Sequence, residues 1–211
     1  MVSEYFTVLE DASGEITEKK SRFIAVIHQV ESENEALEYI ESVKKEHWDA
    51  RHNCFAYVIG TEQPTERASD DGEPSRTAGL PILESIKTSG LTNVCVVVTR
   101  YFGGILLGTG PLAKAYRDSS HEAVLNSRII RMRYLNNVLF TLDYDSYGKI
   151  RYESEKRSMK IVDTQFEDKV FVRMALADNE LEYMTSYLND VSRGSGVVSS
   201  DGCLWISEEK E

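Results

Sequence analysis

Residues 93–127 read NVCVVVTRYFGGILLGTGPLAKAYRDSSHEAVLNS, and they predict a strand, a glycine-rich turn and a helix in that order. The run from Asn93 to Thr99 is apolar and rich in β-branched residues, which is typical of a strand buried on both faces. We expect this strand to end where residues 100–104 (RYFGG) begin. Pro111 suits the first helical position, because its missing N–H would have no partner there, so Gly110 is the expected N-cap.

The same unit has the elements of an anion-binding site, because uncovered amides at a helix start lie near an arginine. The expected binding residues are Arg100, Tyr101, Gly103, Gly104, Gly108, Thr109 and Gly110, with Lys114 and Arg117 on the first helical turns. Residues 108–113 match the G-x-G-x-x-A nucleotide fingerprint in letters, but the acidic residue expected about twenty positions later is missing. The alternative is structural: the glycines make tight turns and let the helix pack on the sheet.

The composition describes a globular chain of 211 residues, 41 % of them hydrophobic, with a formal net charge of −11. Such a charge argues against non-specific nucleic-acid binding by the whole surface. Only residues 100–133 have a positive balance over a long stretch. The three cysteines lack metal-type spacing, and no apolar run approaches membrane-spanning length. We therefore expect a reduced, cytoplasmic protein without membrane contact.

Two parts are expected, at residues 1–133 and 134–211. In the first, strands are predicted at 5–9, 22–30 and 51–60, with a turn at 11–14 and helices at 32–46 and 77–87. Ser32 and Glu35 form a capping box, and Leu37, Ile40 and Val43 form the apolar stripe of that helix. The helix at 77–87 is expected to turn Leu80, Leu83 and Ile86 inward. Residues 61–76 are polar and are expected to form a long loop.

The second part has the element order βαββαβ, which is typical of ferredoxin-like domains. Strands are predicted at 139–143, 161–166, 170–175 and 203–206, with helices at 146–156 and 179–190.

An acidic segment in the 61–76 loop carries Asp70, Asp71 and Glu73. Three carboxylates within four residues are able to hold a hard cation such as magnesium. The alternative is a solvated turn built on Asp71-Gly72.

The strand at 51–60 brings a second candidate group, His52, Asn53 and Cys54. His52 and Cys54 lie on one strand face about 7 Å apart, which is too far for a direct hydrogen bond. One hypothesis is that Cys54 is a nucleophilic thiol, and the alternative is that it is a buried core residue. For Arg100 we weigh a contact to phosphate against pairing with the acidic loop.

Three segments carry a resemblance to a known family. ARHNCFAYVIG (50–60), ERASDDGEPSRTAGLPIL (66–83) and VVVTRYFGGILLGTG (96–110) resemble the signature segments of the IMPACT/YigZ family. The resemblance implies an α+β protein: an N-terminal α/β sandwich like domain 2 of ribosomal protein S5, then a ferredoxin-like domain. The pair is similar to the last two domains of elongation factor G. Leu106 and Pro111 replace a lysine and a glycine common in the family, which weakens the phosphate-contact argument.

The resemblance implies a function in translation control, since eukaryotic IMPACT proteins regulate translation by binding a partner. It supplies no catalytic residues, and we expect no cofactor and no resident metal. The leading hypothesis is a regulatory protein that binds RNA, the ribosome or a translation-control partner through the 61–76 loop and the 100–111 turn. The alternatives are a metal-assisted hydrolase or transferase on a small phosphorylated or peptide-like substrate, and a protein-interaction module. The oligomeric state is left open.

Overall fold

A computed structural model describes residues 2–209, which fall into two compact units. The first unit contains residues 2–131 together with residues 208 and 209, and the second is Met132–Ser207. The domain boundary at residue 133 expected from the sequence stays a prediction. No helix in the described range is both long enough and apolar enough to cross a membrane.

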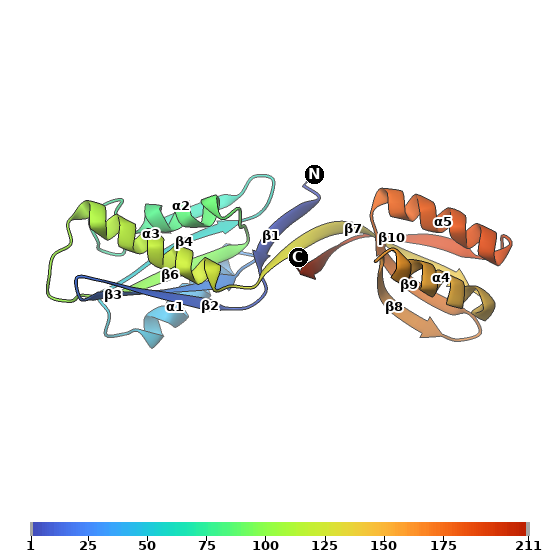
Figure 1. Ribbon diagram of the computed structural model, residues 1–211, viewed down its shortest axis with the longest axis horizontal. Coiled ribbons are helices and arrows are strands. Elements are labelled where there is room, and N and C mark those ends of the chain that lie inside the picture. Colours follow the sequence, from blue (N-terminus) through green and yellow to red (C-terminus); the bar gives the residue numbers. More distant parts are fainter. Residues whose placement is uncertain (1, 210–211) are drawn as a thin grey trace. The chain divides into compact units, whose positions relative to one another are not determined.

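The first unit is built on a five-stranded antiparallel sheet in the order β2-β3-β6-β4-β5 (Figure 1). Its strands are β2 (Ala12–Glu18), β3 (Ser21–Gln29), β4 (His52–Ile59), β5 (Thr65–Ser69) and β6 (Val94–Tyr101). Its helices are α1 (Glu33–Glu46), α2 (Gly79–Thr88) and α3 (Thr109–Leu125). Helices α2 and α3 cover one face of the sheet, and α1 covers part of the other.

Strand β6 lies in the middle of this sheet and is buried on both faces, as its apolar sequence predicts. Val94, Val96 and Val98 face α2 and α3. Cys95 and Val97 face α1. The expected strand end was wrong, since β6 continues through Arg100 and Tyr101.

Two further expectations about strands were wrong. Residues 11–14 do not form a turn, because β2 begins at Ala12 and α3 lies directly on Gly14, where a Cβ would come within 2.4 Å of the Ala123 nitrogen. The polar segment 61–76 contains β5, an edge strand that pairs with β4. An edge strand tolerates polar residues because it has a neighbouring strand on only one side. The polar composition of this segment therefore gives no sign of a strand.

The helices keep their predicted places, but their faces and caps differ in detail. Ser32 caps α1, and the Glu35 carboxylate accepts a hydrogen bond from the Glu31 amide. Ala36 takes the buried place expected for Leu37, which is half exposed. Helix α2 turns Ile82 and Ile86 inward, whereas Leu80 and Leu83 are only partly buried.

The start of α3 also differs from the prediction. Gly108 is its N-cap, and Pro111 is the third helical residue rather than the first. Pro111 is tolerated there because the first four amides of a helix lack intrahelical partners in any case.

The second unit confirms the predicted βαββαβ order. Its elements are β7 (Ile129–Leu142), α4 (Tyr144–Lys156), β8 (Lys160–Phe166), β9 (Val170–Leu176), α5 (Asp178–Ser192) and β10 (Val197–Glu209). The sheet order β10-β7-β9-β8 is that of a ferredoxin-like domain, with β1 (Glu4–Val8) also pairing with β7. Its core is a separate cluster around Phe140, Ile150 and Met184.

The two boundaries between the units fall within strands β7 and β10. The chain leaves the first unit after Arg131, in β7, and returns to it at Glu208, in β10. The returning residues form ion pairs there, Glu208 with Arg131 and Glu209 with Arg128.

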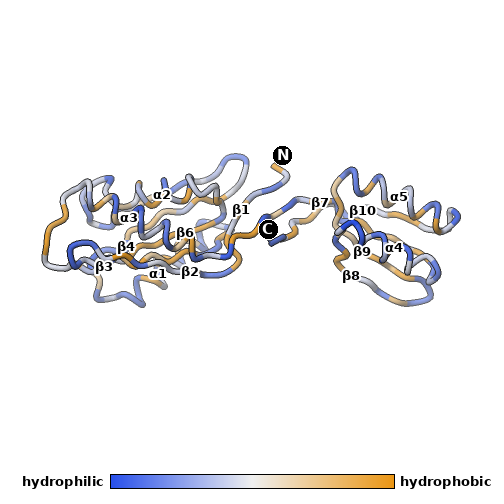
Figure 2. The backbone as a smooth tube through the Cα atoms, in the orientation of Figure 1, coloured by the Kyte–Doolittle hydropathy of each residue, from blue (hydrophilic) through white to orange (hydrophobic). Residues whose placement is uncertain are grey.

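Figure 2 shows apolar residues along the inner strands of both units, and a further apolar segment in the exposed turn between β6 and α3.

Candidate functional site

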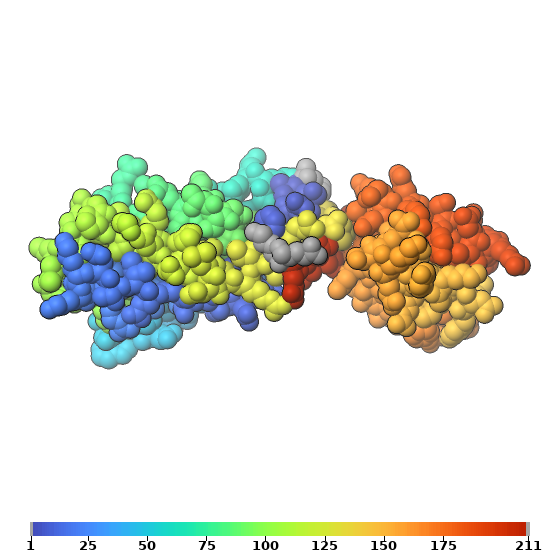
Figure 3. All heavy atoms as spheres, viewed as in Figure 1, coloured from blue at the N-terminus to red at the C-terminus, as the bar shows by residue number. Residues whose placement is uncertain are grey.

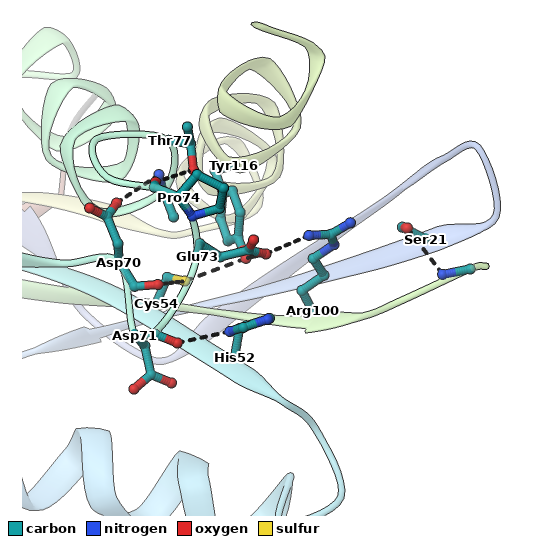
Figure 4. Close-up of polar contacts among 12 residues, drawn as sticks. Ser21, His52, Cys54, Asp70, Asp71, Glu73, Pro74, Thr77, Arg100 and Tyr116 are labelled. Atoms are coloured by element: carbon teal, nitrogen blue, oxygen red, sulfur yellow. Dashed lines mark hydrogen bonds and ion pairs between the residues drawn. The ribbon is translucent and has the colours of Figure 1, made fainter. Parts of the chain in front are cut away.

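A buried ionic cluster joins Arg100, Glu73 and Tyr116 (Figure 4). Arg100 Nη1 donates to Glu73 Oε1 at 2.6 Å, and the Tyr116 hydroxyl donates to the same oxygen at 2.8 Å. Only 8 % of Arg100 is exposed, and its Nε has no hydrogen-bond partner among the described residues. A buried guanidinium donor without an acceptor is costly, so Arg100 is held here against an energetic penalty.

Aromatic rings frame the Arg100 guanidinium. Its carbon lies 5.4 Å from the centre of the Phe23 ring and 5.6 Å from that of Phe102. Phe23 is buried and meets Tyr116 edge to face, whereas Phe102 is 50 % exposed. The cluster therefore extends from the core of the first unit to its surface.

Asp70 holds the loop that delivers Glu73. Its carboxylate accepts the amides of Arg76, Ala78 and Gly79 at 2.7–2.9 Å, which places it at the start of α2. Burial alone would raise the pKa of Asp70, but these amides lower it below its usual value. Asp70 is thus occupied in organising the loop.

His52 and Asp71 meet on the neighbouring strand. His52 Nδ1 lies 2.8 Å from the carbonyl oxygen of Asp71, and a carbonyl only accepts, so Nδ1 carries the proton. In the neutral ring this leaves Nε2 as an acceptor. His52 pairs with Arg100 across β4 and β6, and Figure 4 shows its ring extending toward the Arg100 side chain.

Cys54 lies on the same face as His52, as predicted, but it is fully buried. Its thiol donates to the carbonyl oxygen of Asp70 at 3.0 Å, and it lies 3.4 Å from the Tyr116 hydroxyl. Burial raises the pKa of Cys54 well above its ordinary value. The thiol stays protonated at neutral pH, which does not favour the thiol-nucleophile hypothesis.

Two of the expected site residues lie on the opposite face of the sheet. Tyr101 faces α1, where its hydroxyl donates to Asp49 and accepts from His47. Asn53 is buried on that face and accepts the Thr99 hydroxyl at 2.7 Å. Successive residues of a strand point to opposite faces, so neither side chain joins Arg100 and His52.

The turn between β6 and α3, residues 102–108, is called the glycine turn below. A Cβ on Gly103 would come within 2.1 Å of the Lys20 carbonyl carbon, so only glycine fits beside the β2–β3 hairpin. The Gly103 amide donates to Ser21 Oγ, so one of the backbone donors that the sequence predicts to be uncovered already has an acceptor. Gly104 and Gly108 have positive φ, and no side chain within the described residues caps α3.

The exposed surface of the glycine turn is apolar rather than cationic. Ile105 is 44 % exposed and Leu106 is 84 % exposed. The cations expected from α3 are engaged elsewhere, Lys114 with Asp118 and Arg117 with Glu84. Thr109 and Gly110 are exposed at the start of α3.

The metal alternative finds little support in this geometry. Asp70 binds backbone amides, Asp71 accepts the Asn53 amide, and Glu73 binds Arg100 and Tyr116. Across residues 2–209 no three His, Cys, Asp or Glu side chains are arranged to hold a metal ion.

Two features of this site lie outside the residues that the sequence predicts for it. Tyr116 is not among the expected binding residues, although its hydroxyl anchors Glu73. The β2–β3 turn at Lys19-Lys20 is the second, and its place beside Gly103 has no local signal in the sequence.

Family models match both units, and the similar proteins align with most of the chain. The model of the Impact N-terminal domain matches residues 19–124, and that of a domain of unknown function (DUF1949) matches residues 140–195. The chain is 38 % identical over 208 residues to IMPACT family member YvyE of Bacillus subtilis, covering 99 % of this chain and 96 % of the relative. It is 37 % identical over 179 residues to IMPACT family member YigZ of Escherichia coli, covering 84 % and 88 %.

A solved structure described as a crystal structure of an hypothetical protein has the same fold. It aligns with a TM-score of 0.63 and 33 % identity, over 94 % of this chain and 97 % of that one.

Proposed function

The chain belongs to the IMPACT family, and from that premise we propose that it is a cytoplasmic regulatory protein linked to translation, acting by binding. Its partner is RNA, the ribosome or a translation-control protein. The binding surface is the end of the first unit where His52, Arg100 and the glycine turn meet. Family membership supports the regulatory role, because eukaryotic IMPACT proteins regulate translation through a bound partner.

The observation that carries the binding surface is the state of Arg100. Its guanidinium is nine-tenths buried, neutralised on one side by Glu73, and left with an unpaired Nε. His52 Nε2 lies on the next strand, and the half-exposed Phe102 ring lies over the guanidinium. An oxyanion and a flat ring such as a nucleobase are the groups that this set of side chains suits.

This proposal narrows the surface expected from the sequence. His52 and Arg100 remain in it, as do Gly103, Gly104, Gly108, Thr109 and Gly110 of the glycine turn and the start of α3. Asp70, Asp71 and Glu73 support the surface from within. Tyr101 and Asn53 lie on the other face, and Lys114 and Arg117 are paired.

The test is binding by two variants that leave the fold intact. Phe102→Ala removes an exposed ring, and Arg100→Lys keeps the charge opposite Glu73 while removing Nε. We expect the wild type to bind ribosomes and a fluorescent oligouridine at low salt. Phe102→Ala is expected to bind at least about fivefold more weakly, as is usual for the loss of one stacking contact. Arg100→Lys is also expected to bind more weakly, because lysine lacks the planar set of guanidinium donors.

Phe166→Ala is the matched control, since Phe166 is 55 % exposed in the second unit. Unchanged binding by both site variants would overturn the placement of the surface. A wild type that binds neither ribosomes nor RNA, and that captures no protein from lysate after nuclease treatment, would overturn the function itself. Capture that survives nuclease would assign the same surface to a protein partner.

A further inference from the structure

The turn between β2 and β3 is built from residues that do not suit its backbone. Glu18 pairs with Ser21, so Lys19 and Lys20 form a two-residue hairpin loop. Their φ angles are 46° and 67°. A two-residue turn with φ positive at both positions is a type I′ turn, for which Asn-Gly is the preferred sequence. Two lysines in the left-handed region are strained.

Strain of this kind is commonly retained where the side chains have a task. Both lysine side chains are exposed, and neither has an ion-pair partner within residues 2–209. The nearby cations are neutralised: Arg22 binds Glu15, Lys114 binds Asp118, and Arg100 binds Glu73. Lys19 and Lys20 therefore supply unpaired positive charge at this end of a chain whose net charge is −11.

The turn formed by Lys19 and Lys20 is held against the glycine turn. The Lys20 carbonyl occupies the space that a Gly103 side chain would need, and Ser21 accepts the Gly103 amide at 3.1 Å. Figure 1 shows the hairpin, the glycine turn and the start of α3 at one end of the first unit. In the space-filling view blue atoms of the N-terminal hairpin and yellow-green atoms of the segment around α3 lie side by side at this end (Figure 3). Two free cations thus lie on the same end as the exposed Phe102 ring.

We propose that Lys19, Lys20 and Phe102 form a contact surface for single-stranded RNA, in which the ammonium groups bind phosphates and the ring stacks on a base. This assignment rests on the proposed function and replaces Lys114 and Arg117 as its phosphate-binding cations. Flexible ammonium groups neutralise successive phosphates without reading sequence, and an aromatic ring stacks on any base. Backbone amides at the uncapped start of α3 add donors that suit phosphate oxygens.

The decisive variant is Lys19→Asn combined with Lys20→Gly, because it gives the turn its preferred sequence. A merely structural turn would gain stability and keep its binding. We expect the thermal midpoint to rise while affinity for a fluorescent oligouridine 12-mer falls roughly tenfold at low salt. The slope of log affinity against log salt is expected to fall by about 1.4, since each single-strand phosphate contact contributes about 0.7.

Two controls separate charge position from total charge. Lys149→Gln with Lys160→Gln removes two exposed lysines of the second unit and is expected to leave RNA affinity unchanged. Lys19→Arg with Lys20→Arg keeps both charges in the turn and is expected to keep affinity within about twofold.

If the wild type binds RNA and the Lys19→Asn, Lys20→Gly variant binds equally well, this inference is overturned while the proposed function stands. If the wild type binds no RNA, this inference and the RNA-binding form of the proposed function are both overturned. Binding to vesicles of phosphatidylserine and phosphatidylcholine without binding to the oligouridine would also overturn it, since Ile105 and Leu106 would then serve as a membrane contact.

Discussion

The two units contain the same trio of side chains in different settings. In the first unit Arg100 and Tyr116 both donate to Glu73, and in the second Arg157 and Tyr183 both donate to Glu153. The distances agree closely, at 2.6 and 2.8 Å against 2.6 and 2.7 Å. The chemistry of the contacts is therefore shared.

The two trios differ in burial and in sequence separation. Arg157 follows Glu153 by one helical turn, its side chain is 44 % exposed, and its guanidinium lies over the Tyr183 ring. Arg100 lies 27 residues from Glu73 and only 8 % of its side chain is exposed. A local, half-exposed pair adds a little helix stability, whereas a buried pair costs desolvation and is weak evidence for stability alone. The comparison shows that the first unit keeps its arginine in the interior, whereas the second unit keeps its arginine half exposed.

The largest expected effect comes from breaking the buried trio. Glu73→Gln leaves the Arg100 charge buried without a counter-ion, which is expected to cost about 3–5 kcal/mol of unfolding free energy. Glu153→Gln in the second trio is expected to cost clearly less, because Glu153 is also buried but its partner Arg157 is half exposed and stays hydrated. Urea unfolding followed by circular dichroism measures both, and equal losses in the two variants would contradict the contrast drawn above.

Removing both charges sharpens this prediction. Glu73→Gln combined with Arg100→Met leaves no buried ion, so most of the lost stability is expected to return. The Tyr116 hydroxyl keeps an acceptor in the glutamine oxygen. A double variant no more stable than Glu73→Gln would show that packing, rather than the unpaired charge, accounts for the loss.

A smaller effect is expected at Asp70, which anchors the loop carrying Glu73. Its pKa is lowered in the folded state, so its contribution to stability is present above the pKa of an unfolded aspartate, about 3.9. The contribution is lost as pH falls through the lower folded value. Asp70→Asn is expected to cost about 1–2 kcal/mol at pH 7, as for the loss of a helix cap.

The pH dependence distinguishes this explanation from a general defect. The difference in urea midpoint between the wild type and Asp70→Asn is expected to shrink as pH falls below about 4. Asp168→Asn, in the turn between β8 and β9, is the matched change in the second unit and is expected to alter little. A difference that stays constant from pH 7 to pH 3 would show that the Asp70 charge is not involved.

The smallest perturbation compares the cysteines of the two units. Cys203 is exposed, whereas Cys54 and Cys95 are buried, and burial raises the pKa of Cys95 to about 12. Iodoacetamide at pH 8 is expected to label Cys203 in the native protein and the other two only in urea. Mass spectrometry of tryptic peptides reports the order, and native labelling of Cys54 would reopen the thiol-nucleophile hypothesis.

Much of the fold could be predicted because its signals are local. The β-branched run at 94–98, the capping box at Ser32 and Glu35, and the βαββαβ order of the second part all lie within short windows. The errors came from tertiary contacts. Gly14 was interpreted as part of a turn although α3 packs against it, and edge strand β5 was hidden by its polar composition.

The candidate site was harder to predict than the fold. His52 and Arg100 are both among the expected site residues. The pairing of their strands and its register depend on tertiary structure, and neither segment of sequence predicts them. The placing of Tyr101 and Asn53 on the other face follows from strand alternation and was available from the sequence. The Lys19-Lys20 turn was missed, because its significance depends on its backbone angles and on the distant Gly103.

The return of the chain to the first unit at Glu208 has a consequence for synthesis. A chain emerging from the ribosome makes its N-terminal part first, at about 5–20 residues per second. Here the ion pairs of Arg128 and Arg131 with Glu209 and Glu208 form only after residues 208 and 209 have been made. The first unit is therefore begun early and closed late, so a nascent chain stalled after residue 133 lacks the residues that complete it.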